Sequence, residues 1–352
     1  MAYTTIDDPE AYFQTKLYTG DGSTQSITFD GDTDMQPDLV WIKNRDEADS
    51  HCLFDAVRGA AEVLHSDTYG AETTDADTLT SFDSDGFALG ADDKVNTDTE
   101  AYVAWCWKAG AGSGSSNEDG SINTTSTSVS TTAGFSISTY TGTGSNATVG
   151  HGLGVAPKIV IVKQRDPSVS RNWHLWHGDI PSMSSGYITL NNNDGYVDNF
   201  TPWNGDTTST TFAIGTNTNC NEDTGSYVAY CFIEKQGFFK AGIYTGNGDA
   251  DGPFVYTGFK PAFVMCKQTS SSGQDWFILD NKRENSFNPI TYRIQPSTNS
   301  ADGNGQNHDL LSNGFKHRVS GVFANESGET YIYMAFAEAP FVNSNGVPCN
   351  AR

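Results

Sequence analysis

Short apolar runs alternate with polar, turn-forming segments along the whole chain. Residues 39–42 (LVWI) are typical: they are apolar and rich in β-formers, with Pro37 before them and polar residues after Lys43. Such runs predict buried strands, and a proline just ahead of a strand is well tolerated. Stretches with a helical period are almost absent, although residues 57–64 predict one helical turn. The pattern therefore predicts an all-β protein built from β-sandwiches.

This pattern occurs three times. A Tyr-Thr-Gly opening precedes an apolar run in which a proline stands six positions before Lys43, Lys163 and Lys267, and a Tyr-led apolar strand closes each copy. Repetition at a spacing of about a hundred residues indicates related domains. We predict three tandem related β-sandwich, jelly-roll-like domains: an N-terminal arm at 1–16, repeats at 17–109, 135–236 and 237–338, a linker at 110–134 and a C-terminal extension at 339–352.

The predicted linker consists mainly of Gly, Ser and Thr with almost no apolar content, which is typical of flexible connections. Its second half, around Val129, has the alternation of an edge strand that either neighbouring repeat could accept. Sandwiches joined by a flexible linker predict an elongated appendage.

The chain is strongly acidic, with 43 acidic against 20 basic side chains and a formal net charge of −23. Such a surface repels phosphate backbones and anionic lipid headgroups, so we expect neither nucleic-acid binding nor membrane insertion. No apolar run reaches the roughly 18 residues of a membrane span. The first residues lack the basic start and apolar core of a signal peptide, so we expect the protein to be made in a cytoplasm.

The six cysteines predict free thiols rather than disulfides. Cys106 and Cys231 occupy the same repeat position, where the third copy has Ala335. A position shared by Cys and Ala indicates a small buried site, and the spacing of the others matches no zinc motif.

Motifs that carry catalysis or phosphate binding are missing from the sequence, and none of the seven histidines recurs in all three copies. We therefore predict a non-enzymatic protein without a cofactor. The acidic loop at residues 30–34 resembles a calcium loop superficially, but Trp41 stands where an EF-hand needs a bidentate glutamate. An irregular loop-bound calcium stays open as an alternative.

Two groups of aromatic residues are candidates for surface contacts. Trp203 lies in a polar loop, and His174 and Trp176 share one face of a predicted strand, so all three are candidate ligand-binding residues. Tyr12 and Phe13 form a small apolar hook in the N-terminal arm. This arm has two interpretations, a strand or arm lying on the first domain or a docking peptide for a neighbouring subunit.

Several stretches together resemble a known family. They are the Tyr-Thr-Gly openings, residues 37–45, 79–87 and 102–110, and the C-terminal stretch 335–342 with Asn345 and Gly346. The combination is similar to virion structural proteins of tailed phages, especially marine phages that include cyanophages. This resemblance implies a particle component, often a tail fibre, and carries no catalytic residues.

The resemblance and the absence of catalytic motifs lead to one function and two alternatives. The main expectation is a virion protein, assembled in the host cytoplasm, that serves as a tail-associated fibre or host-adhesion component. Its partners would be other virion proteins, a host surface glycan or receptor, and copies of itself, with a trimer as one option. The alternatives are a capsid decoration or head-fibre protein and a lectin-like carbohydrate-binding module.

Overall fold

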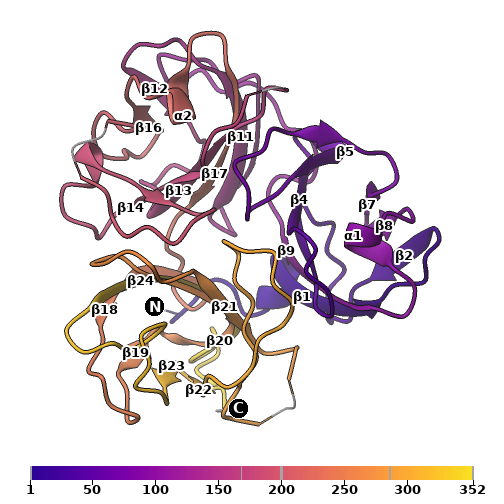
Figure 1. Ribbon diagram of the computed structural model, residues 1–352, viewed down its shortest axis with the longest axis vertical. Helices are drawn as coiled ribbons and strands as arrows, with labels where there is room; N and C mark the ends of the chain where they lie inside the picture. Colours follow the sequence, from indigo (N-terminus) through magenta and orange to yellow (C-terminus); the bar gives the residue numbers. More distant parts are fainter. Residues whose placement is uncertain (1, 168, 199–200, 285–286, 351–352) are drawn as a thin grey trace.

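The computed structural model describes residues 2–167, 169–198, 201–284 and 287–350. Antiparallel strands dominate it, which confirms the all-β prediction. Three lobes, one for each repeat, surround a common centre (Figure 1).

The first repeat contains nine strands and two short helical turns. They are η1 (Pro9–Ala11), β1 (Phe13–Thr19), β2 (Gln25–Thr28), β3 (Leu39–Asn44), β4 (Cys52–Asp55), β5 (Gly59–Leu64), β6 (Thr73–Thr74), β7 (Leu79–Asp83), β8 (Gly86–Leu89), α1 (Asp93–Asn96) and β9 (Ala101–Trp107).

The second and third repeats follow the same plan with fewer strands. The second has β10 (Ser126–Ser130), β11 (Phe135–Thr141), β12 (Ala147–Gly150), β13 (Ile159–Gln164), β14 (His174–His177), η2 (Met183–Ser185), β15 (Ile188–Thr189), β16 (Thr211–Ile214), α2 (Thr218–Asn221) and β17 (Ser226–Phe232). The third has β18 (Phe239–Thr245), β19 (Phe254–Tyr256), β20 (Phe259–Gln268), β21 (Phe277–Asp280), β22 (His308–Leu311), β23 (Gly314–His317) and β24 (Thr330–Pro340).

Each repeat builds a main sheet with the same strand order. That order is β1-β9-β3-β4 in the first repeat, β11-β17-β13-β14 in the second and β18-β24-β20-β21 in the third. Each repeat also has a small sheet, β2-β8-β7, β12-β16 and β19-β23-β22 respectively. The sequence repeat is therefore a repeat of topology.

The predicted helical turn at residues 57–64 is wrong. Residues 59–64 form strand β5, which pairs with β4. Gly59 has a φ of +118°, which glycine adopts without strain, and this places a tight turn where a helix would otherwise continue.

The central strands are buried on both faces, which explains why their sequences are continuous apolar runs. In β3, Val40 and Ile42 pack against the small sheet in a cluster with Phe87. Leu39 and Trp41 belong instead to the large cluster at the centre of the molecule. The first repeat thus has the two facing sheets of a β-sandwich, and its main sheet has a second apolar face that another repeat must cover.

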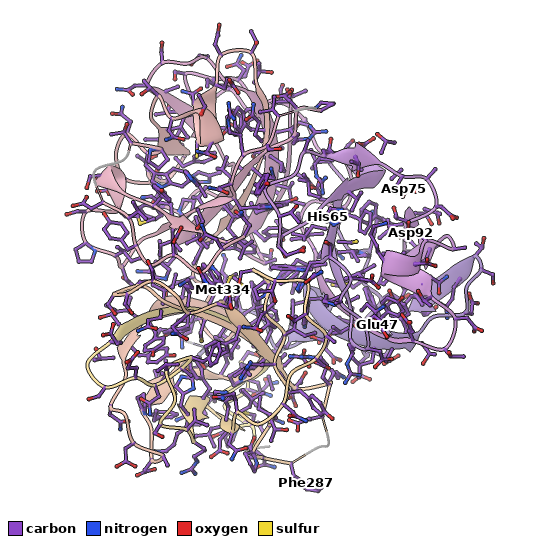
Figure 2. The ribbon with its side chains drawn as sticks, in the orientation of Figure 1. Glu47, His65, Asp75, Asp92, Phe287 and Met334 are labelled. Atoms are coloured by element: carbon purple, nitrogen blue, oxygen red, sulfur yellow. The ribbon has the colours of Figure 1, made fainter. Side chains whose placement is uncertain are left out.

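The large central cluster contains side chains from all three repeats. The ring of Phe336 lies 5.1 Å from Phe13, 5.7 Å from Trp107 and 5.8 Å from Phe232, measured between centroids. Met334, two residues earlier, lies close to the place where the lobes meet (Figure 2). The repeats share one core, and their division into three separate domains remains a prediction.

The Gly/Ser/Thr segment at 110–134 is fixed in place, which corrects the expectation of an elongated appendage on a flexible linker. The buried carboxylate of Asp38 accepts hydrogen bonds from the backbone N–H groups of Ala109, Ala111 and Gly112. Further on, β10 pairs with β11, which confirms the predicted edge strand around Val129. Polar groups inside the protein thus hold a segment whose composition alone suggests flexibility.

The N-terminal arm lies on the third repeat of its own chain. Phe13 begins β1 and is almost fully buried against Phe336, and the partly buried Tyr12 packs edge-on to Phe238. The Tyr3 hydroxyl donates to the carbonyl of Gly258 at 2.7 Å. From Phe13 onward the arm also pairs with β9 of the first repeat, which confirms the interpretation of a strand lying on that repeat. Tyr12 and Phe13 therefore pack within their own chain, and this corrects the interpretation of an apolar hook offered to another subunit.

We expect Phe13→Ala to lower the free energy of unfolding by about 3–5 kcal/mol, because it leaves a cavity in the shared core. Urea denaturation of the full chain measures this change. The matched control is Phe287→Ala, whose side chain is 77% exposed at the outer edge of the third lobe (Figure 2). The control is expected to stay within about 0.5 kcal/mol of the natural chain. Equal, small effects of both substitutions would show that Phe13 is not a core residue.

Candidate functional site

The structure buries all three residues that the sequence offers as surface-binding candidates. Trp203 is 1% exposed and belongs to the central apolar cluster. His174 and Trp176 lie on β14, whose side chains are buried on both faces. The ring of His174 stacks on Tyr187 at 4.4 Å, and burial lowers the pKa of His174 to about 3. The prediction of an exposed aromatic platform is wrong because the main sheet has no solvent-facing side here.

Each junction between repeats is closed by an equivalent backbone hydrogen bond. The amide of Asp302 donates to the carbonyl of Arg45, joining the third repeat to the first. Glu72 donates in the same way to Arg165, and Tyr196 to Thr269. Arg45, Arg165 and Thr269 follow the repeated lysines by two positions, so the three junctions are copies of one another.

Aromatic ring nitrogens add a second set of equivalent contacts. Trp173 Nε1 donates to the carbonyl of His65 at 2.8 Å, and Trp276 Nε1 donates to that of Thr189 at 2.8 Å. At the corresponding place His51 Nε2 lies 3.2 Å from the carbonyl of Gln295. The contacts run in one direction around the ring, from the second repeat to the first, the third to the second and the first to the third.

A buried ion cluster reinforces the junction between the first and second repeats. Arg58 pairs with Asp55 and, at 2.8 Å, with Glu72. Glu72 also receives Arg165 of the second repeat at 2.7 Å, and Tyr230 donates to Asp55 at 2.7 Å. Burial opposes ionisation of Glu72, but the two arginines outweigh this effect and hold its pKa below the usual value.

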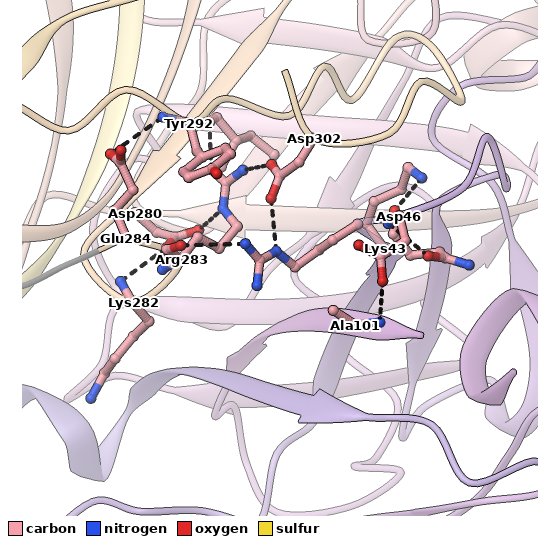
Figure 3. A network of polar contacts seen from close by, with 12 residues as sticks. Lys43, Asp46, Ala101, Asp280, Lys282, Arg283, Glu284, Tyr292 and Asp302 are labelled. Atoms are coloured by element: carbon pink, nitrogen blue, oxygen red, sulfur yellow. Dashed lines mark hydrogen bonds and ion pairs between the residues drawn. The ribbon is translucent and has the colours of Figure 1, made fainter. Parts of the chain in front are cut away.

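A related cluster lies between the first and third repeats (Figure 3). Arg283 donates to Asp280 at 2.6 Å and also pairs with Asp302, which accepts Arg45 at 2.7 Å. Trp105 Nε1 donates to Asp280 at 3.1 Å. Although burial raises the pKa of Asp280, the adjacent Arg283 guanidinium brings it below its usual value.

The junction between the second and third repeats has no carboxylate at the positions of Asp55 and Asp280. Met334 stands where the other repeats have Trp105 and Tyr230, and His177 stands where they have Asp55 and Asp280. Burial lowers the pKa of His177 to about 4, so this imidazole is neutral near pH 7. Two junctions are therefore ionic, and the third is uncharged at these positions.

A polar cleft of about 550 Å³ opens beside the second ion cluster. Its walls include Arg45, Lys282, Arg283 and Glu284. The two guanidinium groups point at Asp302, and Glu284 accepts hydrogen bonds from Thr291. The cleft is thus the open side of a structural ion network.

The three repeated lysines are fully buried. Lys163 Nζ donates to the carbonyls of Arg171 and Tyr69, the second across a junction, and Lys267 Nζ donates to those of Gln268 and Gln274. Burial lowers the pKa of Lys43 and of Lys267 to about 8 and that of Lys163 to about 7. A lowered pKa is typical of amine nucleophiles, but these ammonium groups are enclosed and aimed at carbonyls.

A buried asparagine recurs with the tyrosines, and the sequence interpretation missed it. Asn96, Asn221 and Asn325 each stand six positions before the first tyrosine of the closing strand. Each side-chain amide donates to two loop carbonyls, and each side-chain oxygen accepts an N–H of the loop that follows the Tyr-Thr-Gly opening. The constant spacing to a repeated tyrosine was the available signal.

Most of the cysteine side chains are also enclosed. All six cysteines are free thiols, as predicted, and five of them are buried. Across the residues that the structure describes, no three His, Cys, Asp or Glu side chains come together as a metal site. Within the same residues no helix is long and apolar enough to span a bilayer.

The comparisons with known proteins give a family without an assigned activity. A family model described as Domain of unknown function (DUF7483) matches residues 8–340. A search of curated proteins found no match to the chain.

We expect Arg58→Met to lower the free energy of unfolding by about 3–5 kcal/mol, because it leaves the buried Asp55 without a cation and Glu72 with Arg165 alone. Lys94→Met is the control, since it removes an exposed ion pair with Asp92 and is expected to cost less than about 1 kcal/mol. Urea denaturation compares the two variants. A loss at Arg58 no larger than the loss at Lys94 would show that the buried cluster does not stabilise the junction.

The buried lysines predict a stability that rises with pH. The pKa of Lys163 is about 7 in the folded chain against 10.5 in water, so between these values the unfolded chain binds more protons. The free energy of unfolding therefore increases with pH in this window and falls as pH returns toward 7. We expect the free energy of unfolding of the natural chain to rise relative to that of Lys163→Met by roughly 1 kcal/mol per pH unit from pH 8 to 9.

Denaturation at closely spaced pH values measures this slope, and Lys94→Met serves again as the control. Although partial burial opposes it, the contact with Asp92 raises the pKa of Lys94, so this lysine stays protonated in both states from pH 8 to 9 and the control difference is expected to be flat. A flat difference for Lys163→Met would mean that its ammonium group is solvated in the folded protein.

Proposed function

This chain belongs to the family described as Domain of unknown function (DUF7483), and we propose that it is a non-enzymatic structural protein of a phage virion. The favoured position is a tail-associated fibre or host-adhesion component. The resemblance of the repeats and of the C-terminal stretch to virion proteins of tailed phages supports a location in the virion. The arrangement of the buried side chains supports a structural role.

The observation that carries the proposal is that the buried lysines and arginines bind partners within the protein. The buried lysines hold backbone carbonyls, and the buried arginines hold the carboxylates at two junctions. An enzyme commonly presents such groups to a cavity where a substrate can reach them. Here they join three copies of one fold into a single body, which suits a component that must keep its shape.

The charge of the chain supports a position on the outside of a particle. A net charge of −23 repels packaged nucleic acid and favours solubility of an exposed part. Three lobes around a common centre also give one chain the approximate threefold shape that many appendages reach by trimerisation. Self-association into a trimer remains part of the proposal and is not needed to produce that shape.

Immunogold labelling of intact virions tests the proposal. We expect an antibody against this chain to label the tail, because a fibre or adhesin projects from it. Label spread over the head would move the protein to the alternative of a capsid decoration or head-fibre protein. Particles without any label would overturn the virion role, and saturable binding of glycans by the isolated chain would then favour a lectin-like module.

A further inference from the structure

An open groove runs along one edge of the third repeat. It has a volume of about 390 Å³ and lies between β18 of the main sheet and β19 of the small sheet. Ile243 on β18 is 47% exposed, and Phe254 and Tyr256 on β19 are 45% and 46% exposed. In an acidic chain with few large apolar side chains on its surface, this grouping is unusual.

The backbone of β18 is available along this groove. Its ladder partner is β24, and on the other edge the described part of the chain pairs with it only at Phe239, which bridges to Lys235. Gly246 donates to the carbonyl of Glu329, so the even-numbered positions of β18 face β24. By the alternation of an antiparallel ladder, the N–H and C=O groups of Ala241 and Ile243 face the groove.

The second repeat shows the same place filled. There β10 pairs with β11, the counterpart of β18, and Thr139, which corresponds to Ile243, is buried beneath it. The chain just before β10 forms a bridge between Ile122 and Val149 on β12, the counterpart of β19. Residues 115–130 thus cover both walls of the groove: β10 is the added strand, and the chain before it folds back, with Ser115 bridged to Thr127, and reaches β12.

The first repeat also leaves β1 at an edge, but its groove has a different character. Three of the four residues of β2, Gln25, Ser26 and Thr28, are polar, where β19 has Phe254 and Tyr256. Lys16 on β1 pairs with Asp30, and a charged edge disfavours strand addition. In the third repeat Lys240 lies over the ring of Tyr256 at 5.3 Å, and among the described residues no backbone partner outside the β18–β24 ladder bonds Ala241 or Ile243.

We propose that the third-repeat groove binds an extended strand from a partner polypeptide, which adds to β18 in an antiparallel orientation. The partner segment has the chemistry of residues 115–130: it is rich in Ser and Thr and carries isolated β-branched apolar residues such as Ile122 and Val129. Backbone hydrogen bonds to Ala241 and Ile243 give affinity, and contacts with Phe254 and Tyr256 give selectivity. This site does not depend on the virion role.

A labelled peptide of residues 113–130 is the probe, since this segment already fits the equivalent groove. We expect it to raise fluorescence anisotropy in a saturable way when titrated with the full chain. Ile243→Pro removes an N–H that faces the groove, and Phe254→Ser removes one apolar wall. Each substitution is expected to weaken binding by more than about tenfold.

Two controls separate strand addition from other effects. Val322→Ser changes a 40% exposed apolar residue of the same repeat outside the groove and is expected to leave binding unchanged. A peptide with proline in place of Ser128, whose N–H faces β11 in the natural pairing, is expected not to bind. Circular dichroism confirms that Ile243→Pro is folded, and Phe254→Ser tests the site if it is not.

Three results would overturn the proposal. They are the absence of saturable peptide binding, binding that both groove variants retain, and a dimer that forms without peptide and dissociates with Ile243→Pro. The last result would identify a second copy of the chain as the occupant. Because these measurements use the isolated chain, they can fail while labelling of virions succeeds, and the reverse also holds.

Discussion

The burial of a second apolar face on each main sheet is the constraint on which the structure depends. A sandwich ordinarily hides one face of a sheet and leaves the other to solvent. Here Trp41 and Trp105 project from the far side of the first main sheet, and residues such as Ile161 and Phe263 do the same in the other repeats. A single repeat would expose this surface. Three copies arranged around one centre cover it, so the closed arrangement follows from the pattern of the strands.

Polar groups at the junctions then give that apolar centre a defined alignment. The backbone contacts of Arg45, Arg165 and Thr269 repeat around the ring, whereas the described residues form ionic contacts at only two of the three junctions. Buried ion pairs often add little net stability compared with well-packed apolar groups, but a misplaced partner is costly. We therefore infer that the two ion clusters disfavour misaligned packing of the lobes more than they add net stability. Met334 and His177 occupy the equivalent positions at the third junction, so the junction geometry does not require charge there.

The strands, the threefold repeat and the free thiols could be predicted because each leaves a local pattern. Leu39 to Ile42 form a continuous apolar run since both faces of β3 are buried, and Ala335 in place of Cys106 marks a small enclosed site. The arrangement of the repeats left no such pattern. Trp203 lies in a polar stretch, and only its distant contacts place it in the core. Phe13 is likewise buried by a residue more than three hundred positions away, Phe336. The segment at 110–134 was misjudged because its order comes from Asp38 and β11 rather than from its own composition.

Repetition also makes the differences between copies informative. Thr139 and Ile243 occupy one position of the fold, yet one is covered by β10 and the other is exposed. The segment that precedes β18 reaches its edge only at the bridge between Lys235 and Phe239, because the residues before it belong to β17, a central strand of the second main sheet. The order of the chain thus places β10 beside β11 in the second repeat and, among the described residues, places no equivalent strand beside β18 in the third. Since Phe254 and Tyr256 stand where β12 has the small residues Thr148 and Gly150, the open copy has gained apolar contact surface at the place where it lacks a strand. A groove left open by connectivity and lined with aromatic residues is better suited to a strand from another chain than to solvent.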